Sequence, residues 1–107
     1  MAQTKKNKIT ELSPNQLKFL RGIAHNIKPM LIIGSNGLTD SLMAELDSTL
    51  SHHELLKIKI SYGEREDRKS IVEHILQETG ALHVQTIGKT CVIFRPNEET
   101  ELPLPRK

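Results

Sequence analysis

One stretch, residues 32–39, decides how the chain is organised, and it reads Ile32-Ile33-Gly34-Ser35-Asn36-Gly37-Leu38-Thr39. It is a G-x-x-G loop that ends an apolar strand and opens an amphipathic helix. Two glycines three positions apart let the backbone turn sharply with no Cβ in the way. Ser35 and Asn36 add small polar groups, and the free N–H groups of the next helix follow directly. Such a loop can lie flat against a phosphodiester backbone, so we expect Gly34, Ser35, Asn36 and Gly37 to contact RNA.

The residues before the loop predict a helix and a short strand. Ser13-Pro14-Asn15-Gln16 supplies an N-cap serine, a proline at the first helical position and a capping-box glutamine. Pro29 is expected to end this helix near Asn26. The run Met30–Ile33 is wholly apolar and predicts a strand that is buried on both sides. The apolar face of the helix recurs at offsets 0, 3, 7 and 10, at Leu17, Leu20, Ala24 and Ile27.

The residues after the loop predict two more helices and three more strands. Thr39 is expected to cap the second helix, which should end at Ser51-His52, and the third helix is expected from near Asp67 to Gly80. Strands are expected over residues 56–60, 82–87 and 90–95. Helix crossovers make some strand pairs parallel, whereas the Gly88-Lys89 turn makes the last pair antiparallel. The prediction is an α/β fold, a four-stranded mixed sheet packed with three helices in the order α-β-α-β-α-β-β.

Composition sets the broad class. The chain has 107 residues, a net charge of +2 and a single cysteine, which together fit one domain without disulfides or a cysteine-rich zinc site. No apolar run reaches the length of a membrane span and no signal peptide is visible, so a cytoplasmic protein is expected. We divide the chain into a flexible basic arm (1–11), an RNA-binding domain (12–96) and a disordered Pro- and Glu-rich tail (97–107).

The charge distribution is more informative than the net charge. Residues 1–37 carry six Lys and Arg side chains against Glu11 alone. In the first helix the cations fall at offsets 0, 3, 7 and 10 and form a stripe without an acidic residue, at Lys18, Arg21, His25 and Lys28. We expect this stripe to bind RNA phosphates. The alternative is a solvated face whose cations favour the C-terminal end of the helix dipole.

Two weaker sets of cations are secondary RNA-binding candidates. Arg65, Arg68 and Lys69 lie near the start of the third helix, where a salt-bridged surface turn is the alternative. Lys57 and Lys59 alternate with apolar residues and could line an exposed sheet face, where lysines often serve only solubility.

The sequence offers no catalytic constellation. Gly88-Lys89-Thr90 lacks the first glycine of a phosphate-binding loop, since that position is His83, and a strand rather than a helix follows it. The five histidines show no metal-ligand spacing. We therefore expect no enzyme, no metal, no cofactor and no small-molecule substrate.

Taken together, these residues resemble the CRM domain (chloroplast RNA splicing and ribosome maturation) in its free-standing, YhbY-like form. The resemblance covers about residues 12–96. It is carried by residues 17–25, by Lys28-Pro29, by Ile33–Thr39, by Leu55–Ile60 and by Gly88-Lys89-Thr90 with its strand. It implies a fold like the C-terminal domain of translation initiation factor 3. It also implies binding to ribosomal RNA in precursors of the large ribosomal subunit during ribosome assembly.

The same resemblance implies which residues touch RNA. They are the Gly34–Gly37 loop together with Arg21, His25 and Lys28. Many family members carry a basic residue inside the loop, where this chain has Ser35 and Asn36, so we expect affinity to depend more on the helix. Two alternatives stay open. One is a KH-like binder of single-stranded nucleic acid, and the other is a protein-interaction adaptor on the ribosome.

Overall fold

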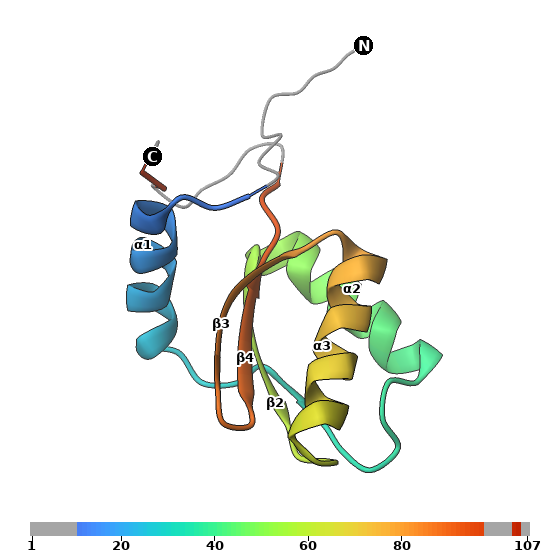
Figure 1. The fold of residues 1–107 in the computed structure, drawn as a ribbon. Coiled ribbons are helices and arrows are strands. Elements are labelled where there is room, and N and C mark those ends of the chain that lie inside the picture. Colours follow the sequence, from blue (N-terminus) through green and yellow to red (C-terminus); the bar gives the residue numbers. More distant parts are fainter. Residues whose placement is uncertain (1–10, 98–103, 106–107) are drawn as a thin grey trace.

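The structure is a computed structural model that describes residues 11–97 and 104–105. Its elements in chain order confirm the predicted order α-β-α-β-α-β-β and the α/β class (Figure 1). They are α1 (Pro14–His25), β1 (Leu31–Ile33), α2 (Asp40–His53), β2 (Leu55–Ile60), α3 (Arg65–Thr79), β3 (Leu82–Ile87) and β4 (Thr90–Phe94).

The four strands form one mixed sheet in the order β1-β2-β4-β3. β1 and β2 are parallel, with Leu31 opposite Ile58. β4 runs antiparallel to both of its neighbours, β2 and β3. The last strand in the sequence is therefore inserted between the second and the third, as the predicted combination of crossovers and a hairpin allows.

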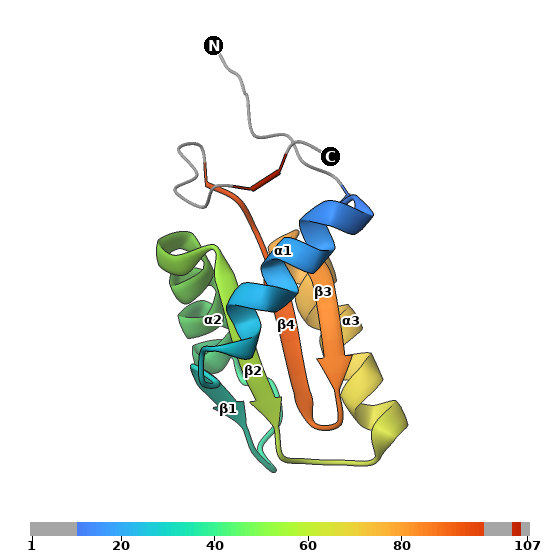
Figure 2. The same ribbon diagram turned by 90° about the vertical axis from the view of Figure 1, so that its left-hand side faces the viewer.

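The helices cover the two sheet faces unequally. α2 and α3 pack against one face, whereas α1 alone crosses the other face diagonally (Figure 2). The larger core lies under α2 and α3 and includes Leu46, Ile58 and Ile93. The smaller core lies under α1 and includes Leu20, Ala24 and Phe94. Alternation along each strand divides the apolar side chains between these two cores.

The first two helix starts agree with the sequence. Ser13 caps α1, since the backbone N–H of Gln16 donates to Ser13 Oγ at 3.1 Å and that of Ser13 donates to Gln16 Oε1 at 2.9 Å. Thr39 Oγ1 accepts from the N–H of Leu42 at 3.1 Å and caps α2. α2 runs one residue further than expected, to His53, and Glu54 follows with φ 66°.

The predicted start of α3 near Asp67 is wrong by two residues. The helix begins at Arg65, and the N–H of Glu64 donates to Asp67 Oδ2 at 2.8 Å. Asp67 therefore lies at the third helical position and closes the first turn instead of opening it. At the other end, Gly80 adopts the left-handed conformation with φ 74°, as expected of a helix-ending glycine.

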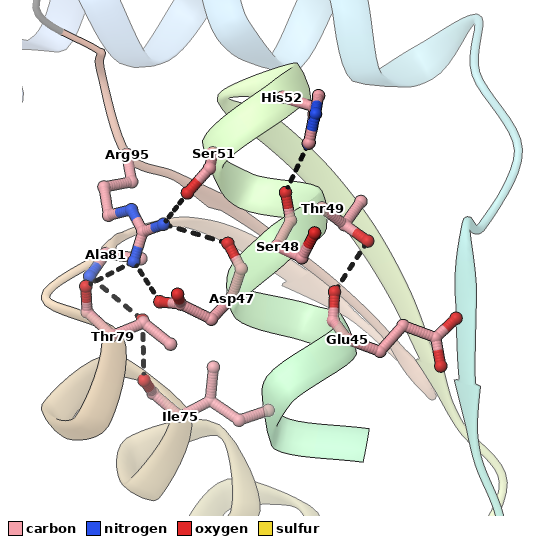
Figure 3. A network of polar contacts seen from close by, with 10 residues as sticks. All are labelled: Glu45, Asp47, Ser48, Thr49, Ser51, His52, Ile75, Thr79, Ala81 and Arg95. Carbon is pink, nitrogen blue, oxygen red and sulfur yellow. Dashed lines mark hydrogen bonds and ion pairs between the residues drawn. The ribbon is translucent and has the colours of Figure 1, made fainter. Parts of the chain in front are cut away.

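Arg95, directly after β4, ties α2 to α3 (Figure 3). Its Nη1 donates to Asp47 Oδ1 at 2.6 Å and to the carbonyl oxygen of Thr79 at 3.0 Å. Its Nη2 donates to the carbonyl oxygen of Asp47 and to Ser51 Oγ. One guanidinium thus joins α2 to the C-terminal end of α3, where a cation interacts favourably with the free carbonyl groups.

β1 differs from its prediction. Leu31 and Ile33 are buried, but Ile32 is 62% exposed, so the strand is not buried on both sides. The reason is its position at the edge of the sheet, where α2 packs on one side and the part of the chain that the structure describes leaves most of Ile32 uncovered on the other.

The tail also differs from the disordered segment that the sequence predicts. Leu104 packs against the smaller core, and Gln16 Nε2 donates to the carbonyl oxygen of Pro105 at 2.8 Å. Asn97 donates its N–H to Glu54 Oε1 at 3.3 Å. The rest of the predicted tail, and the predicted arm up to residue 10, lie outside the described residues.

Candidate nucleic-acid interface

The glycine loop is an open turn between β1 and α2. The N–H of Gly37 donates to the carbonyl oxygen of Gly34 at 2.9 Å, and Gly37 has φ 68°. A Cβ at Gly34 or at Gly37 would meet no atom within 4 Å, so the glycines leave free space in front of the backbone. Gly34, Ser35 and Asn36 are exposed. The backbone of this loop is therefore accessible to a ligand, as expected of a loop that approaches a sugar-phosphate chain.

The basic stripe lies on the outer side of α1. Lys18, Arg21 and His25 are exposed, whereas Leu20 and Ala24 on the opposite side of the helix are buried against the sheet. Lys28 is exposed too, but it lies beyond the helix, in the connection to β1. The stripe thus runs along α1 and continues toward the glycine loop. Between Lys28 and Gly34 lie five residues, three of which form β1, a span on the order of 15–20 Å.

Lys57 has a partner that the sequence does not reveal. Its Nζ donates to the carbonyl oxygens of Ala24 and Ile27, each at 3.0 Å. The first carbonyl belongs to the last turn of α1 and the second to the connection just after it, where a cation stabilises the helix end. Lys57 is half-buried and fixes the end of the helix, whereas Lys59, two positions on, is exposed on the same face.

The third cationic set lies on the other side of the sheet. Arg65, Arg68 and Lys69 line a groove of about 700 Å³ between α3 and the β3–β4 hairpin, together with Glu66 and Glu73. Arg68 Nη1 donates to the carbonyl oxygen of Gly63 at 2.9 Å. The structure therefore brings Lys18, Arg21, His25, Lys28 and Lys59 to one face and separates Arg65, Arg68 and Lys69 from them.

Among the described residues, His83 and Cys91 have shifted pKa values. Burial lowers the pKa of His83, and the nearby guanidinium of Arg21 lowers it further. Burial raises the pKa of the Cys91 thiol to about 11, although a hydrogen bond from Thr86 opposes this. Cys91 is thus a protonated, buried thiol at neutral pH, which makes it a poor nucleophile.

The structure also bears on nucleotide binding, metal binding and membrane insertion. Gly88-Lys89 forms the β3–β4 turn and leads into a strand, so it is not a phosphate-binding loop before a helix. Within residues 11–97 and 104–105, no three His, Cys, Asp or Glu side chains gather to hold a metal ion. In the same part of the chain, no helix has the length and apolar character needed to cross a membrane.

Sequence reasoning missed one feature of the α1 face. A hollow of about 170 Å³ lies beside the C-terminal end of α1, lined by His25, Lys57, Gln85, Ile87, Thr90 and Val92. It is formed where α1 stops short of the hairpin end of the sheet. A helix of 12 residues spans about 18 Å, so a single such helix can cover only part of a four-stranded sheet face. The short length of this helix is the sequence signal that could have indicated the hollow.

Comparison with known proteins gives a consistent result. A family model described as the CRS1 / YhbY (CRM) domain matches residues 12–95. A Haemophilus influenzae protein named as an RNA-binding protein is 46% identical over 99 residues, which cover 92% of this chain and 100% of that protein. A Pseudomonas aeruginosa protein, also named for binding RNA, is 38% identical over 80% of this chain and 83% of that protein.

A solved structure shares the fold. It is the solution structure of a hypothetical protein from Staphylococcus aureus, described as a candidate RNA-binding protein. The TM-score is 0.75 and the sequence identity 35%, over 88% of this chain and 99% of the other.

Proposed function

The chain belongs to the CRS1 / YhbY (CRM) domain family, and on this basis we propose that it is an RNA-binding protein without enzymatic activity. The observation that carries the proposal is the α1 face, where the exposed cations Lys18, Arg21 and Lys28 lead toward the open Gly34–Gly37 turn. No Asp or Glu occurs in α1 or in the four strands. A polyanion can therefore approach this face without meeting a carboxylate of the sheet.

The proposed mechanism divides the work between two elements. The cations of α1 and Lys28 neutralise phosphates, and the glycine loop lets the RNA backbone come close to its N–H groups. Contacts of this kind position an RNA without specifying its sequence. We propose ribosomal RNA in precursors of the large subunit as the target, in the cytoplasm, where assembly of such particles would give the protein its role.

A salt titration tests the binding mode. Each phosphate contact contributes roughly −0.7 to −0.9 to the slope of log K against log salt. The double variant Arg21→Ala/Lys28→Ala should therefore flatten the slope by about 1.5 and weaken all RNAs to a similar degree. The matched control Arg65→Ala/Lys69→Ala removes two cations from the opposite side and should change the slope by less than half as much. Fluorescence anisotropy with a labelled fragment of ribosomal RNA measures both.

The loop is tested at Gly34, where a side chain has room and the backbone is unstrained. Gly34→Asp places a carboxylate against the phosphates and should weaken binding about tenfold, whereas Gly34→Ala should do so by less than threefold. Equal binding by Gly34→Asp and the wild type, with normal circular dichroism, would reduce the loop to a plain turn.

The RNA target is tested in cells by sequencing RNA crosslinked to the protein and by sedimentation with ribosomal particles. Arg21→Glu should release the protein from those particles. An unchanged salt slope together with normal co-sedimentation would favour the adaptor alternative instead. The KH-like alternative has less support, since a KH domain places its G-x-x-G between two helices, whereas here β1 precedes the loop.

A further inference from the structure

α1 leaves part of its sheet face uncovered, and one row of side chains crosses all four strands there. Lys59 lies opposite Ile32 of β1 and Thr90 of β4, and Thr90 lies opposite Ile87 of β3. Side chains that pair across strands share a face, so these four form a continuous row. Ile32 is 62% exposed and Ile87 66% exposed. Two large aliphatic side chains are thus exposed to solvent at the two edges of the sheet.

The hollow beside α1 adjoins this row. Ile87 and Thr90 belong to both, and the hollow also offers the amide of Gln85 and the ring of His25. Its volume of about 170 Å³ is well above the roughly 10–15 Å³ that one water molecule needs, so the hollow has room for a larger group. An amide and a hydroxyl both donate and accept hydrogen bonds. The hollow therefore suits a flat polar group that has an apolar face on one side.

The charge around this surface indicates which kind of ligand can bind there. Lys59 is an exposed member of the row, and Lys28 is exposed in the connection that leads to β1. Lys57 lines the hollow, and its ammonium donates to the carbonyl oxygens of Ala24 and Ile27. The strands and α1 supply no carboxylate to balance these cations. An occupant that is anionic and also carries a flat, partly apolar group matches both properties. Among the parts of an RNA, an unpaired nucleotide has both, whereas a base-paired helix presents mainly its phosphates.

We propose that unpaired nucleotides of the bound RNA pack their bases along the open sheet row Ile32–Lys59–Thr90–Ile87, one of them with its edge in the hollow beside Gln85. The proposal rests on the proposed RNA-binding function and adds a base contact to the phosphate contacts of α1. The base at the hollow buries the exposed aliphatic surface of Ile87, and Gln85 and Thr90 provide its hydrogen-bond partners. Phosphates on either side of this nucleotide lie near Lys59 and Lys28.

An abasic RNA separates base contacts from phosphate contacts. The probes are an RNA duplex with a short single-stranded overhang and the same duplex whose overhang carries ribose without bases. The wild-type protein should bind the first about fivefold more tightly than the second. The variant Ile32→Ser/Ile87→Ser should bind both with the affinity of the abasic probe, and its salt slope should stay unchanged.

The matched control acts on the same face through charge. Arg21→Ala/Lys28→Ala should weaken binding to both probes by the same factor and keep the ratio between them. Gln85→Ala in an otherwise wild-type chain should lower the ratio on its own, so the test does not depend on the folding of the double isoleucine variant. Thermal denaturation confirms that each variant is folded.

The outcomes distinguish the two proposals. Equal wild-type affinity for the two probes, or a ratio that persists in Ile32→Ser/Ile87→Ser and in Gln85→Ala, would overturn the base contact and leave RNA binding intact. Failure of the wild-type protein to bind either probe would overturn RNA binding, and the base contact with it.

Discussion

The two faces of the sheet are built from the same strands but differ in how completely the helices cover them. The face under α2 and α3 is closed, and its core includes Leu46, Ile58 and Ile93, all fully buried. The face under α1 has a core about half that size and an open area around Ile32 and Lys59. The acidic residues of the helices and strands follow the same division, since α2 and α3 carry Asp and Glu side chains but α1 and the strands carry none.

This difference shows how a small domain can hold an open surface. Two helices on one side bury enough apolar area to keep the sheet intact, so the other side can expose apolar and cationic side chains together. Placing the carboxylates on the closed side also keeps them away from the face where an anion would bind.

The largest expected effect compares one isoleucine from each face. Ile58→Ala empties a fully buried position in the larger core and should lower the free energy of unfolding by about 2–5 kcal/mol. Ile32→Ala removes exposed atoms and should cost about 0.5 kcal/mol or less. Urea denaturation measures both. Similar losses for the two variants would mean that the open face contributes as much stability as the closed one.

The next comparison uses two lysines of the α1 face. Lys57→Met keeps the aliphatic stem but deprives the carbonyls of Ala24 and Ile27 of a donor, and should cost about 1–2 kcal/mol of stability. Lys59→Met should leave the stability nearly unchanged and flatten the salt slope of RNA binding by about 0.8. Denaturation and salt titration of both variants test whether Lys57→Met loses stability while Lys59→Met loses RNA affinity. If both variants lose only RNA affinity, Lys57 does not support α1.

A smaller effect concerns the tail that reinforces the weaker core. A chain that ends after Asn97 lacks Leu104 and the hydrogen bond between Gln16 and Pro105, and should lose about 1 kcal/mol of stability. Leu104→Ala in the full chain should account for part of this loss. Calorimetry that finds equal melting temperatures for the full and shortened chains would show that the tail adds nothing to the α1 face.

The smallest expected effect concerns His83 of β3, an edge strand of the sheet. The pKa of His83 is below 6.5 in the folded protein, because of burial and of Arg21, so the unfolded chain binds more protons than the folded one as the pH falls. Stability from this group is complete above about pH 6.5 and decreases as the pH falls below it. Arg21→Gln should raise the pKa of His83, and Lys18→Gln should shift it less, as measured by NMR titration. An unchanged pKa in Arg21→Gln would mean that burial alone lowers it.

Local signals predicted most of the fold. The capping residues Ser13, Gln16 and Thr39 act within one helical turn, so their roles can be read directly from sequence spacing. The start of α3 was misplaced because Glu64, its N-cap residue, is not among the residue types favoured at that position. The exposed turn at Gly34–Gly37 was expected for the same local reason, while its contact with RNA stays a prediction.

Features that depend on distant residues could not be predicted. Ile32 was expected to be buried because its neighbours are apolar, but its exposure follows from the place of β1 at the sheet edge. Lys57 reaches carbonyls about thirty residues earlier in the chain, which no spacing reveals. The open row is likewise a product of strand register, and its members come from four separate segments.

The central place of β4 has a consequence for how the chain acquires its structure during synthesis. β2 and β3 each pair with β4, which is the last strand to leave the ribosome. Until residues 90–94 emerge, β3 has no partner and β2 can pair only with the short β1, so the sheet cannot close gradually from its N-terminal end. Acquisition of the fold should therefore be a late, concerted event dominated by long-range contacts, with the edges of β2 and β3 open to other chains beforehand. A stalled nascent chain that lacks β4 should remain sensitive to protease along its whole length, and adding those five residues and a spacer should protect all of it at once.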